Sequence, residues 1–119
     1  MQADAAIAAV VDKFYGRIMA DSHVSGFFKG VDMERQRAKQ TAFVTMAFGG
    51  PMMYTARGMN EAHRKLREEQ GMDDSHFDAV AGHLQATLLE DFGLPQDLVA
   101  QALAIVGATR EAVMGRASD

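Results

Sequence analysis

The chain has 119 residues, enough for one compact domain at about 150 residues per domain. Hydrophobic residues make up 48% and charged residues 24% of it, which is close to the average for folded proteins and excludes a disordered or low-complexity chain. The net charge of -4 argues against nucleic acid or an anionic membrane as a partner. The absence of cysteine excludes disulfides, thiolate metal sites and Cys nucleophiles. We expect one domain over residues 1–119, with a polar tail at residues 116–119.

Hydropathy along the chain gives no membrane segment. The longest apolar stretches, residues 5–11 and 42–48, are far shorter than the roughly 18 residues that a membrane span requires. The first residues, 1–4, carry an acid where a secretory signal would carry Lys or Arg. A cytoplasmic protein fits these features best.

Helical periodicity is the only regular pattern in the first half of the chain. Apolar residues on one stripe predict a first helix over residues 4–20, and a short inward segment follows that ends at Phe27-Phe28. Asp32 is a candidate N-cap for a second helix that runs to Phe48, where two glycines and a proline stop it. Residues 51–58 are expected to form a loop.

The second half of the chain is predicted to be helical as well. A short helix around Met59 to Leu66 is closed by Gly71, and Asp74 or Ser75 can cap the next helix, which ends at Phe92-Gly93. Pro95 stands at the first turn of a final helix that extends through Val113. The fold class is therefore all-α, with roughly five substantial helices around one core.

One face of the second helix is polar at its start and apolar at its end. Gln36, Lys39 and Gln40 share the direction of Phe43 by helical spacing. Either these first turns project into water, or they border a cavity that holds a polar guest. Tyr15, beside the apolar stripe of the first helix, favours the cavity slightly because a buried phenol needs a hydrogen-bond partner, although tyrosine is also common in an ordinary amphipathic core.

Histidine is the remaining candidate metal ligand. His63 takes an inward place on its helix, either as a core residue with its hydrogen bonds satisfied or as a ligand. His76 and His83 are seven residues apart, which does not match the i, i+4 spacing of a chelating helical pair, and we place both on the surface or at a pocket rim. His23 lies in a predicted turn. Haem is the metal cofactor that needs only one protein ligand, so it is the only metal chemistry for which the sequence has room.

Other catalytic motifs are absent from the sequence. It contains no G-x-S-x-G, no G-x-x-x-x-G-K-[ST] and no G-x-G-x-x-G. The run at residues 64–69 mixes charges of both signs, which is typical of a solvent-exposed helix face.

Seven short strings in the sequence carry a family resemblance. They are Asp12-Lys13-Phe14-Tyr15, Phe27-Phe28, Val31-Asp32-Met33, Gln36-Arg37-Ala38-Lys39-Gln40, Ala47-Phe48-Gly49-Gly50, Ala62-His63-Arg64 and His76-Phe77-Asp78. In this order and spacing they resemble the group 1 truncated haemoglobins, especially the cyanobacterial and green-algal members, from about Ala5 to Val113. The resemblance implies a truncated globin fold, in which a two-over-two helical sandwich encloses haem b.

The resemblance also implies roles for individual residues. His63 resembles the proximal iron ligand. Tyr15, Gln36, Lys39 and Gln40 resemble the distal residues that stabilise a bound ligand. The residues expected to contact the porphyrin are Phe28, which resembles the clamping aromatic residue, together with Lys39, Phe43, Phe48, Tyr54, Phe77 and Leu84.

Two positions depart from the family pattern. Lys39 stands where some cyanobacterial relatives have a histidine that ligates iron from the distal side, so Lys39 is expected either to occupy the sixth coordination position or to pair with a haem propionate. Thr109 stands at about the position of a histidine that some relatives join covalently to a haem vinyl group. We therefore expect non-covalent haem b.

The function that follows is reversible binding of O2, NO and CO, with NO dioxygenation when an as yet unidentified reductase supplies electrons. Oxygen transport, oxygen sensing or electron transfer by the same pocket is an alternative that would not make the protein an enzyme. A cofactor-free helical interaction module is a further alternative. We expect a monomer.

Overall fold

The computed structural model describes residues 2–30, 32–50 and 56–116, with only the backbone described for residues 2–4, 33 and 56. Within these residues every regular element is helical, which confirms the predicted all-α class. The elements in chain order are α1 (Gln2–Met19), the 3-10 turn η1 (Ser25–Phe27), α2 (Met33–Ala47), α3 (Ala56–Gln70), α4 (Asp74–Ala86), the π-helical η2 (Thr87–Asp91), α5 (Gln96–Gly107) and α6 (Arg110–Val113).

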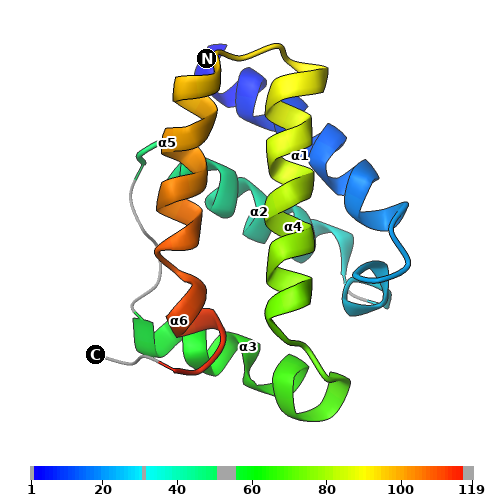
Figure 1. Cartoon of the computed structure of the whole chain (residues 1–119). Helices are drawn as coiled ribbons and strands as arrows, with labels where there is room; N and C mark the ends of the chain where they lie inside the picture. Colours follow the sequence, from blue (N-terminus) through cyan, green and yellow to red (C-terminus); the bar gives the residue numbers. More distant parts are fainter. Residues whose placement is uncertain (1, 31, 51–55, 117–119) are drawn as a thin grey trace.

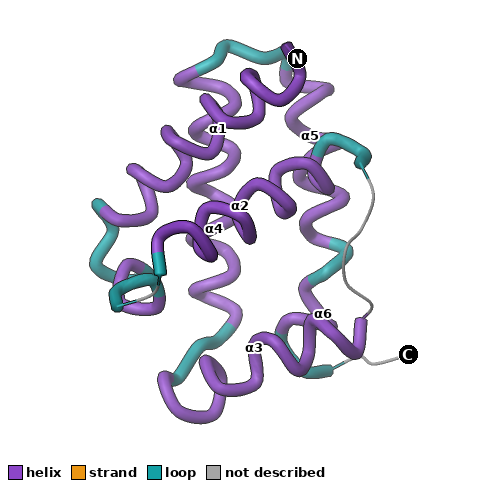
Figure 2. The backbone as a smooth tube through the Cα atoms, turned by 180° about the vertical axis from the view of Figure 1, so that it is seen from behind, coloured by secondary structure: helices purple, strands orange, loops and turns teal. Residues whose placement is uncertain are grey.

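Four of these helices form two layers. In Figure 1, α4 and α5 run antiparallel in front, and α1 and α2 lie behind them. Figure 2 shows the reverse side, where α1 and α2 cross in front of the other pair. Contacts join α1 to α2, α4 to α5, and each layer to the other. This is the two-over-two arrangement that the resemblance implies, with α3 outside it and packed mainly against α6.

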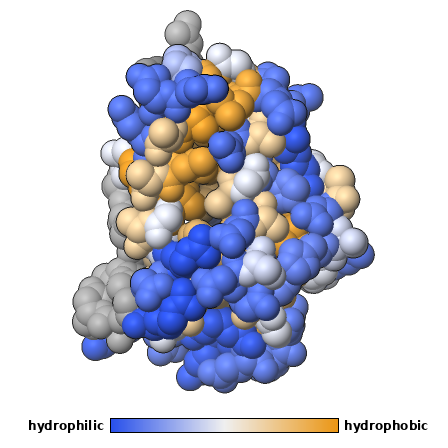
Figure 3. Space-filling model, viewed as in Figure 1, coloured by the Kyte–Doolittle hydropathy of each residue, from blue (hydrophilic) through white to orange (hydrophobic). Residues whose placement is uncertain are grey.

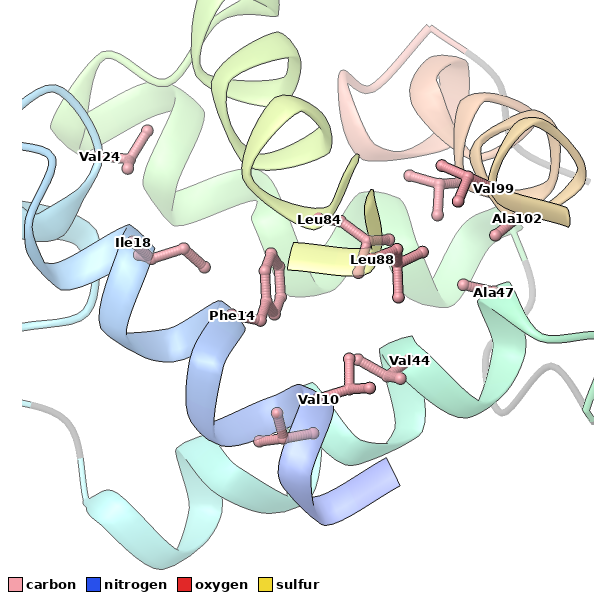
Figure 4. Packing of buried hydrophobic residues seen from close by; sticks show 12 residues of the cluster. Val10, Phe14, Ile18, Val24, Val44, Ala47, Leu84, Leu88, Val99 and Ala102 are labelled. Atoms are coloured by element: carbon pink, nitrogen blue, oxygen red, sulfur yellow. The ribbon is translucent and has the colours of Figure 1, made fainter. Parts of the chain in front are cut away.

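The main core lies between the two layers. Phe14 and Ile18 of α1 are each 1% exposed, and Leu84 of α4 and Leu88 of η2 are fully buried. Figure 4 shows these side chains converging with those of α2 and α5. Burial of one such side chain contributes about 1.5–3 kcal/mol, so the apolar stripes found in the sequence account for how the layers are held together.

A smaller apolar cluster joins α3 to the sandwich. It consists of Met46 from α2, Met59 from α3 and Ala112 from α6. Phe43 packs against both this cluster and the main core, and its ring stacks on Phe14 at a centroid distance of 5.7 Å. Phe43 is therefore the apolar connection between the sandwich and the region of α3.

The predicted ends of α2 are confirmed. The carboxylate of Asp32 accepts a hydrogen bond from the backbone N–H of Glu34 at 2.9 Å, as an N-cap does. At the other end Gly49 adopts a left-handed φ of 89°. A Cβ at Gly50 would come within 2.8 Å of the Thr45 carbonyl oxygen, so the chain can turn back here only with glycine at that position.

Two predicted helix starts are wrong. The helix of His63 begins at Ala56, so residues 56–58 are helical and do not belong to the expected loop. The rest of that loop, residues 51–55, lies outside the described part of the chain. The N-cap of α4 is Asp73, because its carboxylate accepts from Ser75 N–H while the His76 ring accepts from Asp73 N–H. This reciprocal pair satisfies two backbone donors at once, which a cap at Asp74 or Ser75 would not do.

The last two predicted helices are also modified. The helix from Asp74 does reach Phe92-Gly93, but its last turn is π-helical where the Thr87 hydroxyl donates to the His83 carbonyl at 2.8 Å. The final helix is interrupted at Ala108–Thr109, where the Thr109 hydroxyl donates to the Val106 carbonyl at 2.7 Å. The interruption lets α6 turn toward α3.

Surface polarity differs between the two ends of the molecule. Figure 3 shows apolar residues over the upper part of the α4 and α5 layer, whereas the lower part, where α3 lies in the same view, is mainly hydrophilic. No helix in the described ranges combines the length and hydropathy needed to cross a bilayer.

Candidate functional site

His63 is held on α3 as a neutral imidazole with one nitrogen available. Its Nδ1 lies 2.8 Å from the Met59 carbonyl oxygen, so Nδ1–H donates to this carbonyl in the neutral ring. Within the described part of the chain no group bonds to Nε2, which then carries the lone pair. Burial lowers the pKa of His63, and the nearby charges of Arg67 and Lys39 lower it further against the effect of the Met59 carbonyl. A neutral, oriented imidazole of this kind can ligate a metal at neutral pH.

Arg67 fixes α3 one turn after His63. Its guanidinium donates to the Val113 carbonyl at 2.6 Å and to the Asn60 side-chain oxygen at 2.7 Å. The prediction that residues 64–69 form only a solvent-exposed face is therefore wrong for Arg67, which is half-buried because the end of α6 supplies an acceptor. Charge patterning along one helix could not reveal an acceptor that comes from 46 residues further along the chain.

The polar face of α2 points inward at two of its three residues. Gln36 is 8% exposed and Gln40 is 5% exposed, whereas Lys39 is exposed. The alternative in which these turns project into water is thus wrong for both glutamines and right for Lys39. The charge of Lys39 makes a small contribution to the lowered pKa of His63.

The amide of Gln40 is the unusual group of this face. Among the described residues neither its nitrogen nor its oxygen has a hydrogen-bond partner, although both atoms are fully buried. A buried polar group left in this state costs about 1–3 kcal/mol. Such a cost is offset when a ligand or water supplies the missing partner, so Gln40 is a candidate binding residue.

Tyr15 lies beside Gln40. The two residues line the same pocket between α1 and α2, and Tyr15 is half-buried. The structure therefore brings together the tyrosine of the first helix and the glutamine of the second, as the resemblance implies.

The expected porphyrin contacts are placed differently from one another. Phe28, Phe43 and Phe77 are half-buried and pack against the main core. Leu84 is completely buried in that core, and Phe48 is 38% exposed beyond the end of α2. Tyr54 lies outside the described residues. Phe43 packs against the cluster of Met46 and Met59, and the carbonyl of Met59 orients His63. Among the expected porphyrin contacts, Phe43 is therefore linked most directly to the histidine.

The other three histidines have structural partners. His23 stacks on His76 with ring centroids 4.2 Å apart, and His83 Nε2 lies 2.7 Å from an Asp21 carboxylate oxygen. His23 lies in a turn as predicted, and His76 and His83 are half-buried where the η1 corner meets α4. No cluster of three or more His, Asp or Glu that could hold a metal occurs among the described residues.

The residues present fit haem. Haem needs a single protein ligand. The neutral His63 ring can offer Nε2 as this ligand, while its Nδ1 is held by the Met59 carbonyl. The unpartnered Gln40 amide supplies hydrogen-bonding capacity, and Phe43 with the methionine cluster supplies apolar surface near the histidine. Between α5 and α6, Thr109 is buried and bonded to backbone, and a threonine has no imidazole that could form a covalent link to the porphyrin.

Comparison with known proteins identifies the family. The family model described as bacterial-like globin matches residues 2–114. A group 1 truncated haemoglobin, GlbN of Synechocystis sp., is 50% identical over 103 residues, which cover 87% of this chain and 82% of the relative.

Solved structures agree with this result. A globin from Synechococcus sp. PCC 7002, whose crystal structure has a haem modification, superposes with a TM-score of 0.85 at 41% identity and covers 94% of this chain and 92% of that one. The structure of THB1 from Chlamydomonas reinhardtii gives a TM-score of 0.82 at 47% identity and covers 94% and 90% of the two chains. The chain therefore belongs to the bacterial-like globin family and, within it, to the group 1 truncated haemoglobins.

Proposed function

We propose that this globin holds haem b through His63 and binds O2, NO and CO in a pocket bordered by Tyr15, Gln36 and Gln40. The observation that carries the proposal is the buried Gln40 amide, which has no hydrogen-bond partner in the described part of the chain and lines the same pocket as Tyr15. When bound, haem supplies the iron to which a diatomic ligand coordinates and the redox chemistry. The chain supplies orientation, hydrogen-bond donors and control of access.

Gln40 and Tyr15 give the pocket a preference for polarised ligands. An amide N–H or a phenol O–H that donates to a ligand with partial negative charge contributes about 0.5–1.5 kcal/mol, and more when the bond is charge-assisted. With haem in place, O2 would carry more negative charge than CO, so the donors of Tyr15 and Gln40 would favour O2 over CO. The same donors should slow the release of O2.

The carbonyl of Met59 determines which nitrogen of His63 serves as ligand. Because Nδ1–H donates to this carbonyl, Nε2 remains the unprotonated nitrogen. The lowered pKa keeps the ring neutral at neutral pH, so haem binding does not have to displace a proton from it.

We further propose that the protein converts NO to nitrate. The balanced reaction is NO + O2 + one electron giving nitrate, and a reductase as yet unidentified would supply the electron. Tyr15 and Gln40 would hold O2 in a fixed orientation while NO enters. Stopped-flow mixing of the oxygenated protein with NO tests this: rapid formation of one nitrate per haem supports it, whereas slow reaction or no nitrate leaves oxygen transport, sensing or electron transfer by the same pocket.

Lys39 has two possible roles, as a sixth ligand to iron or as a partner of a haem propionate. Ligation requires the neutral amine, because only an unprotonated nitrogen has a lone pair to give, so a ligating Lys39 should give a low-spin spectrum that strengthens with rising pH. The Lys39→Ala variant decides between them. Loss of the low-spin bands supports ligation, and an unchanged spectrum at neutral and alkaline pH supports the propionate role.

The first experiment is an absorption spectrum of the purified protein in ferric, ferrous and CO-bound states. An intense haem band supports the haem function, and its absence would favour a cofactor-free interaction module. We propose a cytoplasmic location, which is in keeping with a chain that contains no cysteine. We also propose that the protein is a monomer, which size-exclusion chromatography tests.

A further inference from the structure

The side chain of Arg67 reaches back along α3 past His63. Asn60, His63 and Arg67 follow one another at i, i+3 and i+7, which places them on one face of the helix. Nη2 of Arg67 donates to the Asn60 side-chain oxygen at 2.7 Å, and its Nη1 donates to the Asn60 carbonyl oxygen at 3.3 Å. The guanidinium therefore lies along the two turns of α3 in which His63 stands.

Two consecutive carbonyls of α3 accept hydrogen bonds from these side chains. The Met59 carbonyl accepts from Nδ1–H of His63, and the Asn60 carbonyl accepts from Arg67. Nη1 of Arg67 also donates to the Val113 carbonyl at 2.6 Å, at the end of α6. Arg67 thus ties the turn that orients the imidazole to a second helix.

The residues that follow α6 cover the guanidinium. A Cβ added at Gly115 would come within 2.7 Å of Cζ of Arg67, so the guanidinium lies directly against the backbone of this glycine. A larger residue at position 115 would displace the charged group from its acceptors. The Val113 carbonyl and Gly115 together enclose one side of Arg67, in keeping with its half-buried state.

The charge of Arg67 has no counter-ion in the described part of the chain. Its acceptors there are neutral oxygens, two from Asn60 and one from Val113. Four other arginines pair with carboxylates: Arg17 with Asp91, Arg37 with Asp12, Arg110 with Asp78 and Arg116 with Asp74. Because a guanidinium keeps its proton in proteins, Arg67 presents a full positive charge to the surroundings of His63.

This charge acts on the His63 ring. Burial is the main cause of the lowered pKa of His63, and the charge of Arg67 lowers it further. Charges interact more strongly where water is excluded, because the effective dielectric constant is lower there. A half-buried cation at this position therefore disfavours additional positive charge on the imidazole or on a metal that it binds.

We propose that Arg67 is a positioning residue for His63 and that its unpaired charge raises the reduction potential of the haem iron that His63 binds. Ferric haem carries one more positive charge than ferrous haem, so a nearby cation favours the ferrous form. The ferrous form is the one that binds O2 and CO, and the axial ligand and the groups around it are the means by which a protein tunes this potential. The inference rests on the proposed function, because it requires haem on His63.

The test is the midpoint potential of the haem-loaded protein, measured by spectroelectrochemical titration of three variants. Arg67→Met and Arg67→Gln remove the charge. We expect the equilibrium between the two oxidation states to shift toward ferric by about three- to tenfold, which corresponds to a potential about 30–60 mV lower for one electron. Arg67→Lys keeps the charge and loses the planar fork, so its equilibrium should stay within about twofold of the unaltered protein.

Arg64→Met is the matched control for loss of a cation. Arg64 is an exposed residue of the same helix, next to His63 in the chain. Water and salt screen an exposed charge, so its removal should change the equilibrium by less than about twofold. An equal fall in Arg64→Met and Arg67→Met would overturn the specific role of Arg67.

Amide hydrogen exchange in α3 of the same samples separates the charge from the packing. All three substitutions at position 67 disturb the fork, so exchange should accelerate in each of them, in Arg67→Lys as well. If Arg67 only held the helix in place, the potential would follow the exchange rates and Arg67→Lys would behave like Arg67→Met. That result overturns the proposal, as does a potential left unchanged in both charge-free variants.

The haem band distinguishes failure of this inference from failure of the proposed function. A normal haem band with unchanged potentials in Arg67→Met and Arg67→Gln overturns the role of Arg67 and leaves the proposed function intact. An unaltered protein without a haem band overturns both. Arg67→Gln retains an amide donor for the Val113 carbonyl, so it carries the test if Arg67→Met fails to retain haem.

Discussion

The four helices of the sandwich and the helix that carries His63 are held by different forces. The sandwich is joined by apolar side chains such as Phe14, Leu84 and Leu88, none of which is more than 1% exposed. Helix α3 lies outside the sandwich, and Met59 is the one hydrophobic residue among its described side chains that is buried. Arg67 fixes this helix to the end of α6 by a hydrogen bond to the Val113 carbonyl. Figure 3 shows that the surface is apolar over the upper part of the molecule and hydrophilic over the lower part, where α3 lies in the same view in Figure 1.

The magnitudes of these forces imply different stabilities. Burying one large apolar side chain contributes about 1.5–3 kcal/mol, whereas one intramolecular hydrogen bond contributes about 0.5–1.5 kcal/mol net. The sandwich has many of the former, so it should stay folded without cofactor. Helix α3 has few, so a cofactor bound through His63 should contribute much of its order.

The charged contacts of α6 extend the comparison. Arg116 pairs with Asp74 at 2.9 Å, and together with Arg110 it lowers the pKa of Asp74 to about 2. These exposed pairs fasten α6 to the start of α4, and α6 in turn holds α3. Besides the apolar cluster of Met46, Met59 and Ala112, helix α3 is thus attached to the sandwich through polar contacts of α6 and of the residues that follow it.

The largest expected effect comes from removing the imidazole of His63. In His63→Gly and His63→Leu we expect haem affinity to fall by at least about 100-fold. Loss of a residue that only hydrogen-bonds to a metal ligand typically costs ~10–100-fold, and loss of the ligand itself should cost more. Haem transfer to an acceptor apoprotein measures the change. Added imidazole should restore binding to His63→Gly and not to His63→Leu. Unaltered haem uptake and spectra in both variants would contradict the assignment of the ligand.

The second effect concerns the attachment of α3. Arg67→Met removes the hydrogen bonds to Val113 and Asn60, and bonds from a charged donor are worth about 1.5–3 kcal/mol. Amide hydrogen exchange in α3 should accelerate by roughly 10- to 100-fold, while exchange in α1 stays unchanged. Arg64→Met is the matched control, since Arg64 is an exposed residue of the same helix. Equal acceleration in both helices would show that α3 is not a separate unit.

A smaller effect of mixed sign is expected at Gln40. In Gln40→Leu the unpartnered amide is removed, so the free energy of unfolding of the haem-free protein should rise by about 1–3 kcal/mol. The same variant should release O2 faster by up to about tenfold, because a donor worth ~1.4 kcal/mol is lost. Gln36→Leu is the control for the stability effect alone, since the Gln36 amide is not among the fully buried atoms without a partner. A loss of stability in Gln40→Leu would argue against a binding role for the amide.

The smallest effect is a dependence of stability on pH. The pKa of His63 lies below 6.5 in the folded protein, so on acidification the unfolded chain takes up a proton before the folded chain does. The free energy of unfolding of the haem-free protein should therefore fall as the pH drops below 6.5, until the pKa of the folded state is passed. Urea titrations of the unaltered protein and of His63→Leu between about pH 7 and about pH 5 measure the difference. Parallel curves for the two proteins would show that burial does not disfavour the charged ring.

The sequence alone determined the helices, most of their ends and the face that each buries. The stripe that contains Phe14, the cap at Asp32 and the stop at Gly49 depend on spacing and backbone chemistry within a few residues of the chain, so periodicity is enough to find them. His63 was found on an inward face for the same reason, and the family resemblance gave it a role.

Only the tertiary structure decided which polar residues are buried and with what partners. Gln40 and Lys39 are adjacent in the chain, yet one is enclosed and the other exposed, because α1 covers only part of the polar face of α2. Arg67 is fixed by a carbonyl of α6, which no pattern within α3 could indicate. Apolar burial follows a local period, whereas the partner of a buried polar group comes from whichever distant segment packs against it.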